Sequence, residues 1–205
     1  MLTTRDIQVV RYLEDGLLLT ADIASRLIFH TPNKKSSLVI AQRRLNELYK
    51  EKEVKRMRDS ATNSFVYYIG KTPTKTIHKL KIADFISRVA TSGFEILDYQ
   101  LEYSQLQDNY HIRPDLLLTV SYHGTKVVFL VEVDITKPFS NLDAYTKLIK
   151  DKRNGVVLPL PDLPLLIVSV SDSPIKVEAG SIRPIQIKTD FSNLESQIKK
   201  PFIQK

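Results

Sequence analysis

Apolar residues recur at intervals of three and four through the first part of the chain, a spacing typical of amphipathic helices. The spacing predicts three helices joined by short turns, over residues 4–14, 21–29 and 36–50. Thr3 or Thr4 is the expected N-cap of the first helix and Thr20 that of the second, because a threonine hydroxyl accepts hydrogen bonds from first-turn amides. Two short runs, 54–58 and 65–69, flank a polar turn and predict a β-hairpin.

The polar, proline-containing stretch 71–77 shows no periodicity and predicts a linker. Beyond it, helical and strand patterns follow one another in the order αβββαβ. The expected elements are a helix over 78–92, strands over 94–103, 113–122 and 125–135, a helix over 141–153 and a strand over 163–171. We therefore expect an α+β or α/β protein with domains over 1–70 and 78–190, followed by a basic tail over 191–205.

The chain of 205 residues is basic, because 30 Lys and Arg against 23 Asp and Glu give a formal net charge of +7. Nine basic residues and three glutamates lie between Lys34 and Arg58, so this segment carries most of the excess and favours a polyanionic partner. The absence of cysteine excludes disulfides, thiolate zinc sites and iron–sulfur clusters. No apolar run approaches the roughly 20 residues of a membrane span. The first residues lack the apolar core of a signal peptide, so we expect a cytoplasmic protein without membrane contact.

Three short helices followed by a hairpin resemble a winged helix–turn–helix. The resemblance implies that the third helix enters the major groove of duplex DNA and that the hairpin touches the backbone. The candidate DNA-binding residues are Lys34, Lys35, Ser36, Gln42, Arg43, Arg44, Asn46, Lys50, Lys55, Arg56 and Arg58. Gln42, Arg43 and Asn46 are the expected base readers, and helix amides near Ser36 favour a phosphate. The alternative is a solvated basic face on a protein-binding module.

The dipeptide His123-Gly124 is a candidate two-residue hairpin turn. Such a turn pairs Asp115 with Glu132 and Arg113 with Asp134 on one face of the sheet, while the other face is apolar. Carboxylates directly opposite each other, about 5 Å apart, repel. A cationic side chain, a proton or a divalent ion must therefore compensate, and Mg²⁺ or Mn²⁺ suits an all-oxygen ligand set.

The motif Pro114-Asp115 followed by Glu132-Val133-Asp134, within this element order, resembles the PD-(D/E)XK nuclease fold. The resemblance implies that Asp115 and Glu132 bind a divalent metal ion. The lysine of the family motif is replaced here by Asp134, which becomes a candidate third ligand or water-orienting group. Lys147 on the following helix, or else Lys137, is the candidate replacement for that lysine.

The chain as a whole, with its winged helix, these acidic motifs and a helix carrying Lys147-Leu148, resembles the replication-relaxation family. The resemblance implies a DNA-binding accessory protein of a plasmid or other mobile element. Its implied partners are double-stranded DNA, replication or relaxosome proteins, and a second copy of the chain. Two alternatives stay open. One is a metal-dependent DNA endonuclease, and the other is a dimeric transcriptional regulator whose second domain only dimerises.

Overall fold

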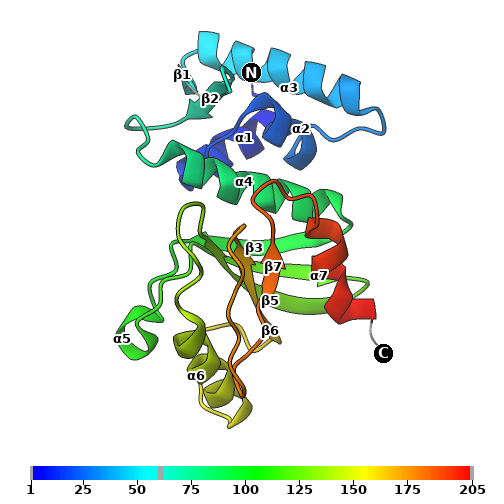
Figure 1. Cartoon of the computed structure of the whole chain (residues 1–205). Coiled ribbons are helices and arrows are strands. Elements are labelled where there is room, and N and C mark those ends of the chain that lie inside the picture. The colour runs from blue at the N-terminus through cyan, green and yellow to red at the C-terminus, as the bar shows by residue number, and fades with distance from the viewer. Residues whose placement is uncertain (1, 60–61, 204–205) are drawn as a thin grey trace. The chain divides into compact units, whose positions relative to one another are not determined.

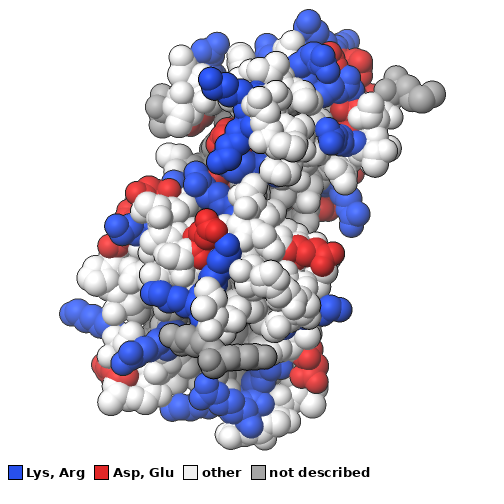
Figure 2. All heavy atoms as spheres, turned by 90° about the vertical axis from the view of Figure 1, so that its right-hand side faces the viewer, with Lys and Arg blue, Asp and Glu red and all other residues white. Residues whose placement is uncertain are grey.

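The computed structural model describes residues 2–59 and 62–203 and has the mixed α+β composition that the sequence predicts (Figure 1). Tertiary contacts divide the chain into two compact units, Met1–Ser92 and Gly93–Lys205. Lys and Arg side chains cover more of the face drawn in Figure 2 than Asp and Glu side chains do, in keeping with the positive net charge. No helix among the described residues is long and apolar enough to cross a membrane.

The N-terminal unit begins with three helices and a β-hairpin. Their bounds are α1 Thr4–Glu14, α2 Ala21–Leu27, α3 Lys34–Lys50, β1 Lys55–Arg58 and β2 Phe65–Tyr68. The side chains of Thr3 and Thr20 cap α1 and α2 by accepting hydrogen bonds from first-turn amides, as predicted. α3 begins at Lys34, two residues before the predicted start at Ser36, because the side chain of Asn33 caps it there.

The hairpin is joined by a third chain segment, which the sequence did not predict. Leu19, between α1 and α2, forms an antiparallel bridge with Tyr67 of β2. The Leu19 amide donates to the Tyr67 carbonyl at 3.2 Å, and the Tyr67 amide donates back at 2.8 Å. Both side chains are buried, as are Leu45 and Leu48 of α3. The hairpin is therefore attached by hydrogen bonds to the segment that leads into α2.

Helix α4, Thr76–Thr91, belongs by its contacts to the N-terminal unit. Arg26 of α2 forms an ion pair with Asp84 of α4 at 2.5 Å and donates a hydrogen bond to Ser87 at 3.0 Å. The sequence pattern placed this helix at the start of the second domain, after a linker over 71–77. The division between the compact units instead follows Ser92, because α4 packs along α2.

The C-terminal unit contains one five-stranded sheet in the order β3-β4-β5-β6-β7. The strands are β3 Glu95–Leu101, β4 Leu116–Tyr122, β5 Thr125–Val133, β6 Leu165–Val170 and β7 Ile185–Ile187. Strands β3, β4 and β5 are antiparallel neighbours, whereas β6 and β7 continue the sheet in parallel. The predicted register is confirmed, since Leu116 lies opposite Val131 and Leu118 opposite Phe129. The predicted αβββαβ order has four strands, so β7 is a fifth strand that the sequence did not predict.

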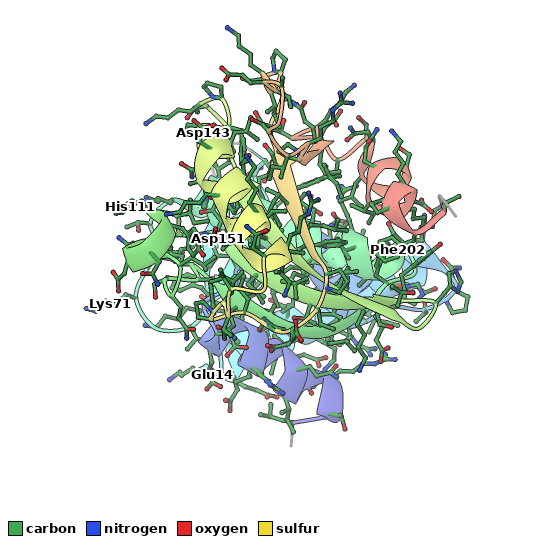
Figure 3. The ribbon with its side chains drawn as sticks, turned by 90° about the horizontal axis from the view of Figure 1, so that it is seen from below. Glu14, Lys71, His111, Asp143, Asp151 and Phe202 are labelled. Carbon is green, nitrogen blue, oxygen red and sulfur yellow. The ribbon has the colours of Figure 1, made fainter. Side chains whose placement is uncertain are left out.

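Two helices cover opposite faces of this sheet. On one face, Tyr145 and Leu148 of α6, Leu142–Arg153, pack with Leu117 and Leu130. On the other, Phe202 of α7, Leu194–Ile203, lies against the rings of Phe94 and Tyr122 with centroids 5.4 and 5.3 Å away. Asp143 and Asp151 mark α6 in Figure 3, and Phe202 marks the helix on the other face.

Most of the described part of the predicted basic tail over 191–205 is the packed helix α7. Its side chains at Leu194 and Ile198 are buried. A short helix that the sequence reading treated as loop, α5 Gln107–Tyr110, lies between β3 and β4.

Candidate nucleic-acid interface and acidic cluster

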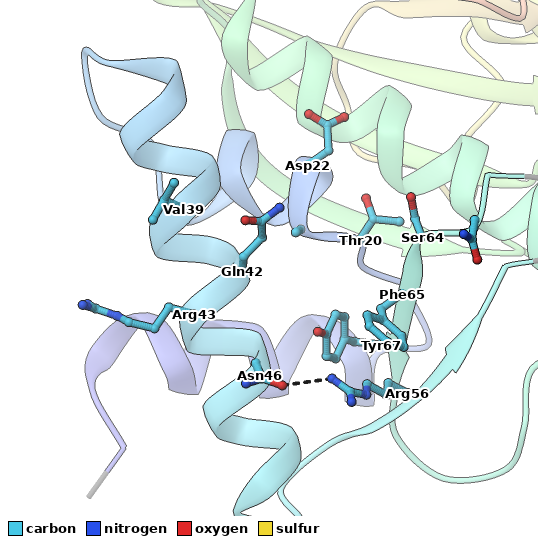
Figure 4. A pocket seen from close by; sticks show the side chains of 12 residues that line it. Thr20, Asp22, Val39, Gln42, Arg43, Asn46, Arg56, Ser64, Phe65 and Tyr67 are labelled. Carbon is cyan, nitrogen blue, oxygen red and sulfur yellow. Dashed lines mark hydrogen bonds between the residues drawn. The ribbon is translucent and has the colours of Figure 1, made fainter.

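A hollow of about 600 Å³ lies in the N-terminal unit between α3, the start of α2 and the hairpin (Figure 4). Its lining includes Thr20 and Asp22 from α2, Val39, Gln42, Arg43 and Asn46 from α3, and Arg56, Phe65 and Tyr67 from the hairpin. We call this hollow the α3–hairpin groove. Four of the predicted DNA-binding residues, Gln42, Arg43, Asn46 and Arg56, are thus brought together by the fold.

The side chains that α3 presents to the groove follow helical spacing. Gln42 and Asn46 point toward the hairpin, whereas the guanidinium of Arg43 extends away from it (Figure 4). Val39, one turn before Gln42, is 62% exposed. The sequence reading centred the exposed face on Ser36, Arg43 and Lys50 and missed Val39. The sequence alone could have indicated Val39, because it is an apolar residue outside the buried stripe of α3, where a surface helix normally carries polar residues.

Arg56 of β1 is held in one orientation by three neighbours. Its guanidinium carbon lies 4.0 Å from the ring centroid of Tyr49 and 4.1 Å from that of Phe65. Its Nη1 donates a hydrogen bond to the Asn46 side-chain oxygen at 2.9 Å (Figure 4). A guanidinium fixed in this way loses little conformational entropy when it binds an anion. Asn46 therefore orients Arg56, a role different from the base reading that was predicted for it.

The other predicted hairpin contacts have partners of their own. Arg58 donates a hydrogen bond to Asn63 at 2.7 Å, and its guanidinium carbon lies 4.8 Å from the Phe65 ring centroid. The ammonium of Lys55 donates to the Gly70 carbonyl at 2.7 Å. Both cations are exposed, so these bonds leave their charges accessible to a phosphate.

Arg44, predicted to contact DNA, is a structural residue. Its Nε donates to Asp6 at 3.0 Å, and its two Nη groups bond Asp6 and Glu47. The Asp6 side chain is fully buried and also accepts the Thr3 amide, which completes the capping box of α1. Burial favours a raised pKa for Asp6, but the bonds from Arg44 and Thr3 outweigh it and lower that pKa below its usual value. The Arg44–Asp6 pair therefore ties α3 to α1.

Two of the amides at the N-terminus of α3 that were predicted to hold a phosphate are already hydrogen-bonded within the fold. The side-chain oxygen of Asn33 accepts hydrogen bonds from the amides of Lys35 at 3.0 Å and Ser36 at 3.3 Å. The side chains of Lys34, Lys35 and Ser36 are exposed, as is that of Lys50 at the other end of the helix. Lys35 and Ser36 can therefore contribute to anion binding through their side chains but not through their amides.

In the C-terminal unit, the confirmed register brings Asp115 and Glu132 together beside α6. The Asp115 carboxylate accepts the Val133 amide at 2.8 Å. Glu132 is 7% exposed, and its Oε1 accepts hydrogen bonds from the Tyr145 hydroxyl at 2.8 Å and the Asn141 amide at 3.2 Å. We call these five residues the Glu132 cluster. Tyr145 and Asn141 were not predicted, and only their positions on the helix that covers Glu132 could have indicated them.

Burial raises the pKa of Glu132 to about 7, and repulsion from the carboxylates of Asp115 and Asp134 acts in the same direction. The hydrogen bonds from Tyr145 and Asn141 oppose this rise without cancelling it. The pKa of Tyr145 is also raised, chiefly by burial and next by the nearby Glu132 carboxyl. The Tyr145 hydroxyl therefore stays protonated and can donate a hydrogen bond.

Two residues expected beside the Glu132 cluster have contacts elsewhere. Arg113 forms an ion pair with Glu102 at 2.8 Å. Lys147 is exposed, with its ammonium 5.5 Å from the ring centroid of Tyr110. Two residues beyond Tyr145, Lys147 is turned by roughly 200° about the helix axis, away from Glu132.

The sequence predicted a divalent metal ion at Asp115, Glu132 and Asp134. Among the residues that the structure describes, no three His, Cys, Asp or Glu side chains are grouped to hold one. The buried carboxyl of Glu132 accepts hydrogen bonds from Tyr145 and Asn141. The geometry fits a hydrogen-bonded carboxyl inside the fold.

Comparisons with known proteins give no relative for this chain. No family model matches it, and neither any curated protein nor any solved structure does so.

Proposed function

We propose that the N-terminal unit is a winged helix–turn–helix that binds duplex DNA, with α3 in the major groove and the hairpin along the sugar–phosphate backbone. The observation that carries the proposal is the α3–hairpin groove, in which Gln42 and Asn46 of α3 point toward the hairpin that carries Arg56, and which Val39 also lines. The excess of basic residues between Lys34 and Arg58 supports it, because phosphates neutralise charges that otherwise repel one another.

The proposed docking gives each groove residue a chemical role. Gln42 is exposed and its side chain matches the donor and acceptor pair of adenine in the major groove. Val39 offers an apolar contact to a thymine methyl group. Arg56, held between two rings, takes a phosphate, and Arg43, exposed on the far side of α3, takes a base edge or the opposite backbone.

For the whole chain, we propose an accessory role in the replication or DNA relaxation of a plasmid or other mobile element. The resemblance to the replication-relaxation family supports this proposal. In this role the C-terminal unit serves assembly or contact with DNA rather than cleavage. The endonuclease alternative stays a prediction, which a Mn²⁺ titration tests.

The experiment is binding of the full chain to a duplex selected from a random-sequence library, followed by fluorescence anisotropy over a range of salt concentrations. Arg56→Ala should reduce the slope of log K against log salt by about 0.9, the value for one lost phosphate contact. Gln42→Ala should weaken binding by about 1–3 kcal/mol and relax the preference at one base pair, with the slope unchanged. Lys176→Ala, an exposed cation of the C-terminal unit, is the control.

The proposal fails if no duplex is selected. It also fails if Arg56→Ala and Gln42→Ala bind the selected duplex as the control does, with both variants folded by circular dichroism.

A further inference from the structure

A second hollow, of about 420 Å³, lies within the C-terminal unit. It is bounded by α6, by β6 and by the segment 180–185 that leads into β7. Its volume falls within the roughly 300–1,000 Å³ that small-molecule sites occupy. We call it the α6–β6 pocket.

The walls of this pocket are aliphatic. Its apolar lining comes from Ile149, Leu165, Leu166, Ile167, Ile182 and Ile185. No aromatic residue is among the described residues that line it, so the pocket offers no ring on which a nucleobase stacks. An aliphatic lining of this kind complements a saturated hydrocarbon body.

Three cationic side chains, those of Lys150, Arg153 and Arg183, line the same pocket, and none of the described lining residues is acidic. All three are exposed. Within the described part of the chain, none of these side chains forms an ion pair or a hydrogen bond, in contrast to neighbouring Lys152, which pairs with Asp162. Three like charges at one rim repel each other, and a single carboxylate or phosphate relieves that repulsion and binds arginine through two hydrogen bonds.

The wall opposite the sheet is held in place by α6. The Thr146 hydroxyl donates to the Leu142 carbonyl at 2.8 Å and accepts the Ile182 amide at 3.2 Å, which attaches the segment 180–185 to the helix. Gly180 has φ +85°, a conformation that favours glycine, at the point where the chain enters this segment. The pocket is therefore formed without a ligand, so binding need not order its walls.

We propose that the α6–β6 pocket binds a small aliphatic anion, a medium-chain molecule with one carboxylate or phosphate head. The hydrocarbon lies on the isoleucine and leucine lining, and the head lies between Arg153 and Arg183. This inference is independent of the proposed DNA binding, because all of its residues belong to the other unit. Duplex DNA lacks the aliphatic surface that the lining requires, so its phosphates match only the rim.

The test is calorimetric titration of the full chain with decanoate and with decyl phosphate, both below their micelle concentrations. At least one of them should bind saturably at one site per chain, and the stronger of the two identifies the head group. Decanol and decyltrimethylammonium share the hydrocarbon but lack the negative charge, and should bind at least about tenfold more weakly. Equal binding of decanol, or no saturable binding of either anion, overturns the proposal.

Variants locate the site and separate it from non-specific attraction. Arg153→Ala combined with Arg183→Ala should weaken binding at least about tenfold. Ser181→Phe, which fills the pocket and leaves its charges in place, should abolish binding. Lys150→Ala should weaken binding more than its control, Lys176→Ala, which removes an exposed lysine outside the pocket.

Anion binding that persists in the folded Ser181→Phe protein places the contact on the rim alone and refutes the proposal.

Discussion

We expect Glu132→Gln to stabilise the C-terminal unit at pH 8 and to leave its stability at pH 5 almost unchanged. The pKa of Glu132 is raised from 4.5 to about 7 in the folded protein, chiefly by burial. Between these values the folded state keeps a proton that the unfolded state has lost. The free energy of unfolding therefore falls as the pH rises from 4.5, and the loss is complete above pH 7.

The size of this effect follows from the raised pKa. Each tenfold change in a proton-binding constant corresponds to about 1.4 kcal/mol, so ionising Glu132 costs about 3 kcal/mol of stability at pH 8. The side chain is 7% exposed, and solvent screening reduces this figure little. Glutamine has nearly the same shape, does not titrate, and offers an oxygen to the Tyr145 hydroxyl.

Amide hydrogen exchange at β5 is the appropriate assay, because the chain has two units and a single unfolding transition is not assured. Protection of the Leu130 and Val131 amides is compared between the wild type and the variant at each pH, which cancels the pH dependence of intrinsic exchange. Glu178→Gln makes the same chemical change at an exposed carboxyl and should have no effect. Equal differences at both pH values, or a wild type more protected at pH 8 than at pH 5, would show that Glu132 is ionised in the fold.

Three further outcomes are expected. Arg44→Ala should destabilise the N-terminal unit by about 3 kcal/mol in urea denaturation, because it leaves the buried Asp6 carboxylate without its cation. Replacing one thymine of the selected duplex by uracil should weaken binding, and Val39→Ala should remove that dependence if Val39 contacts the methyl group. Mn²⁺ calorimetry should give no saturable heat, and plasmid should stay uncut; tight binding abolished by Asp115→Ala would instead support a nuclease.

The β4–β5 register was predictable because it depends on local information. The residues at the turn, His123 and Gly124, both have positive φ, +47° and +81°, as a two-residue hairpin of type I′ requires. Alternation of apolar residues then fixes which side chains share a face. The alternation could not show that a helix covers each face of the sheet. It therefore did not predict the hydrogen bond from the Tyr145 hydroxyl of α6 to Glu132.

The sequence could not show which residues far apart along the chain are in contact. The helical pattern of α4 gives its apolar face but not the helix against which it packs, and Arg26 lies 58 residues from Asp84. The Arg44–Asp6 pair spans 38 residues in the same way, so Arg44 looked like one more exposed cation. Strand β7 is only three residues long, too short to show an alternating apolar pattern in the sequence. It is recognised as a strand by its parallel pairing with β6.

The partner of each cation says more about function than the net charge of +7 does. Arg26 and Arg44 are bound to carboxylates inside the N-terminal unit and hold its helices together. Arg56 is bound to neutral groups, two rings and an amide, so its position is fixed, and no carboxylate among the described residues neutralises its charge. A fixed guanidinium without a counter-ion beside an open groove is suited to an external anion. A charge count along the sequence cannot separate it from Arg44, whose charge is already neutralised within the fold.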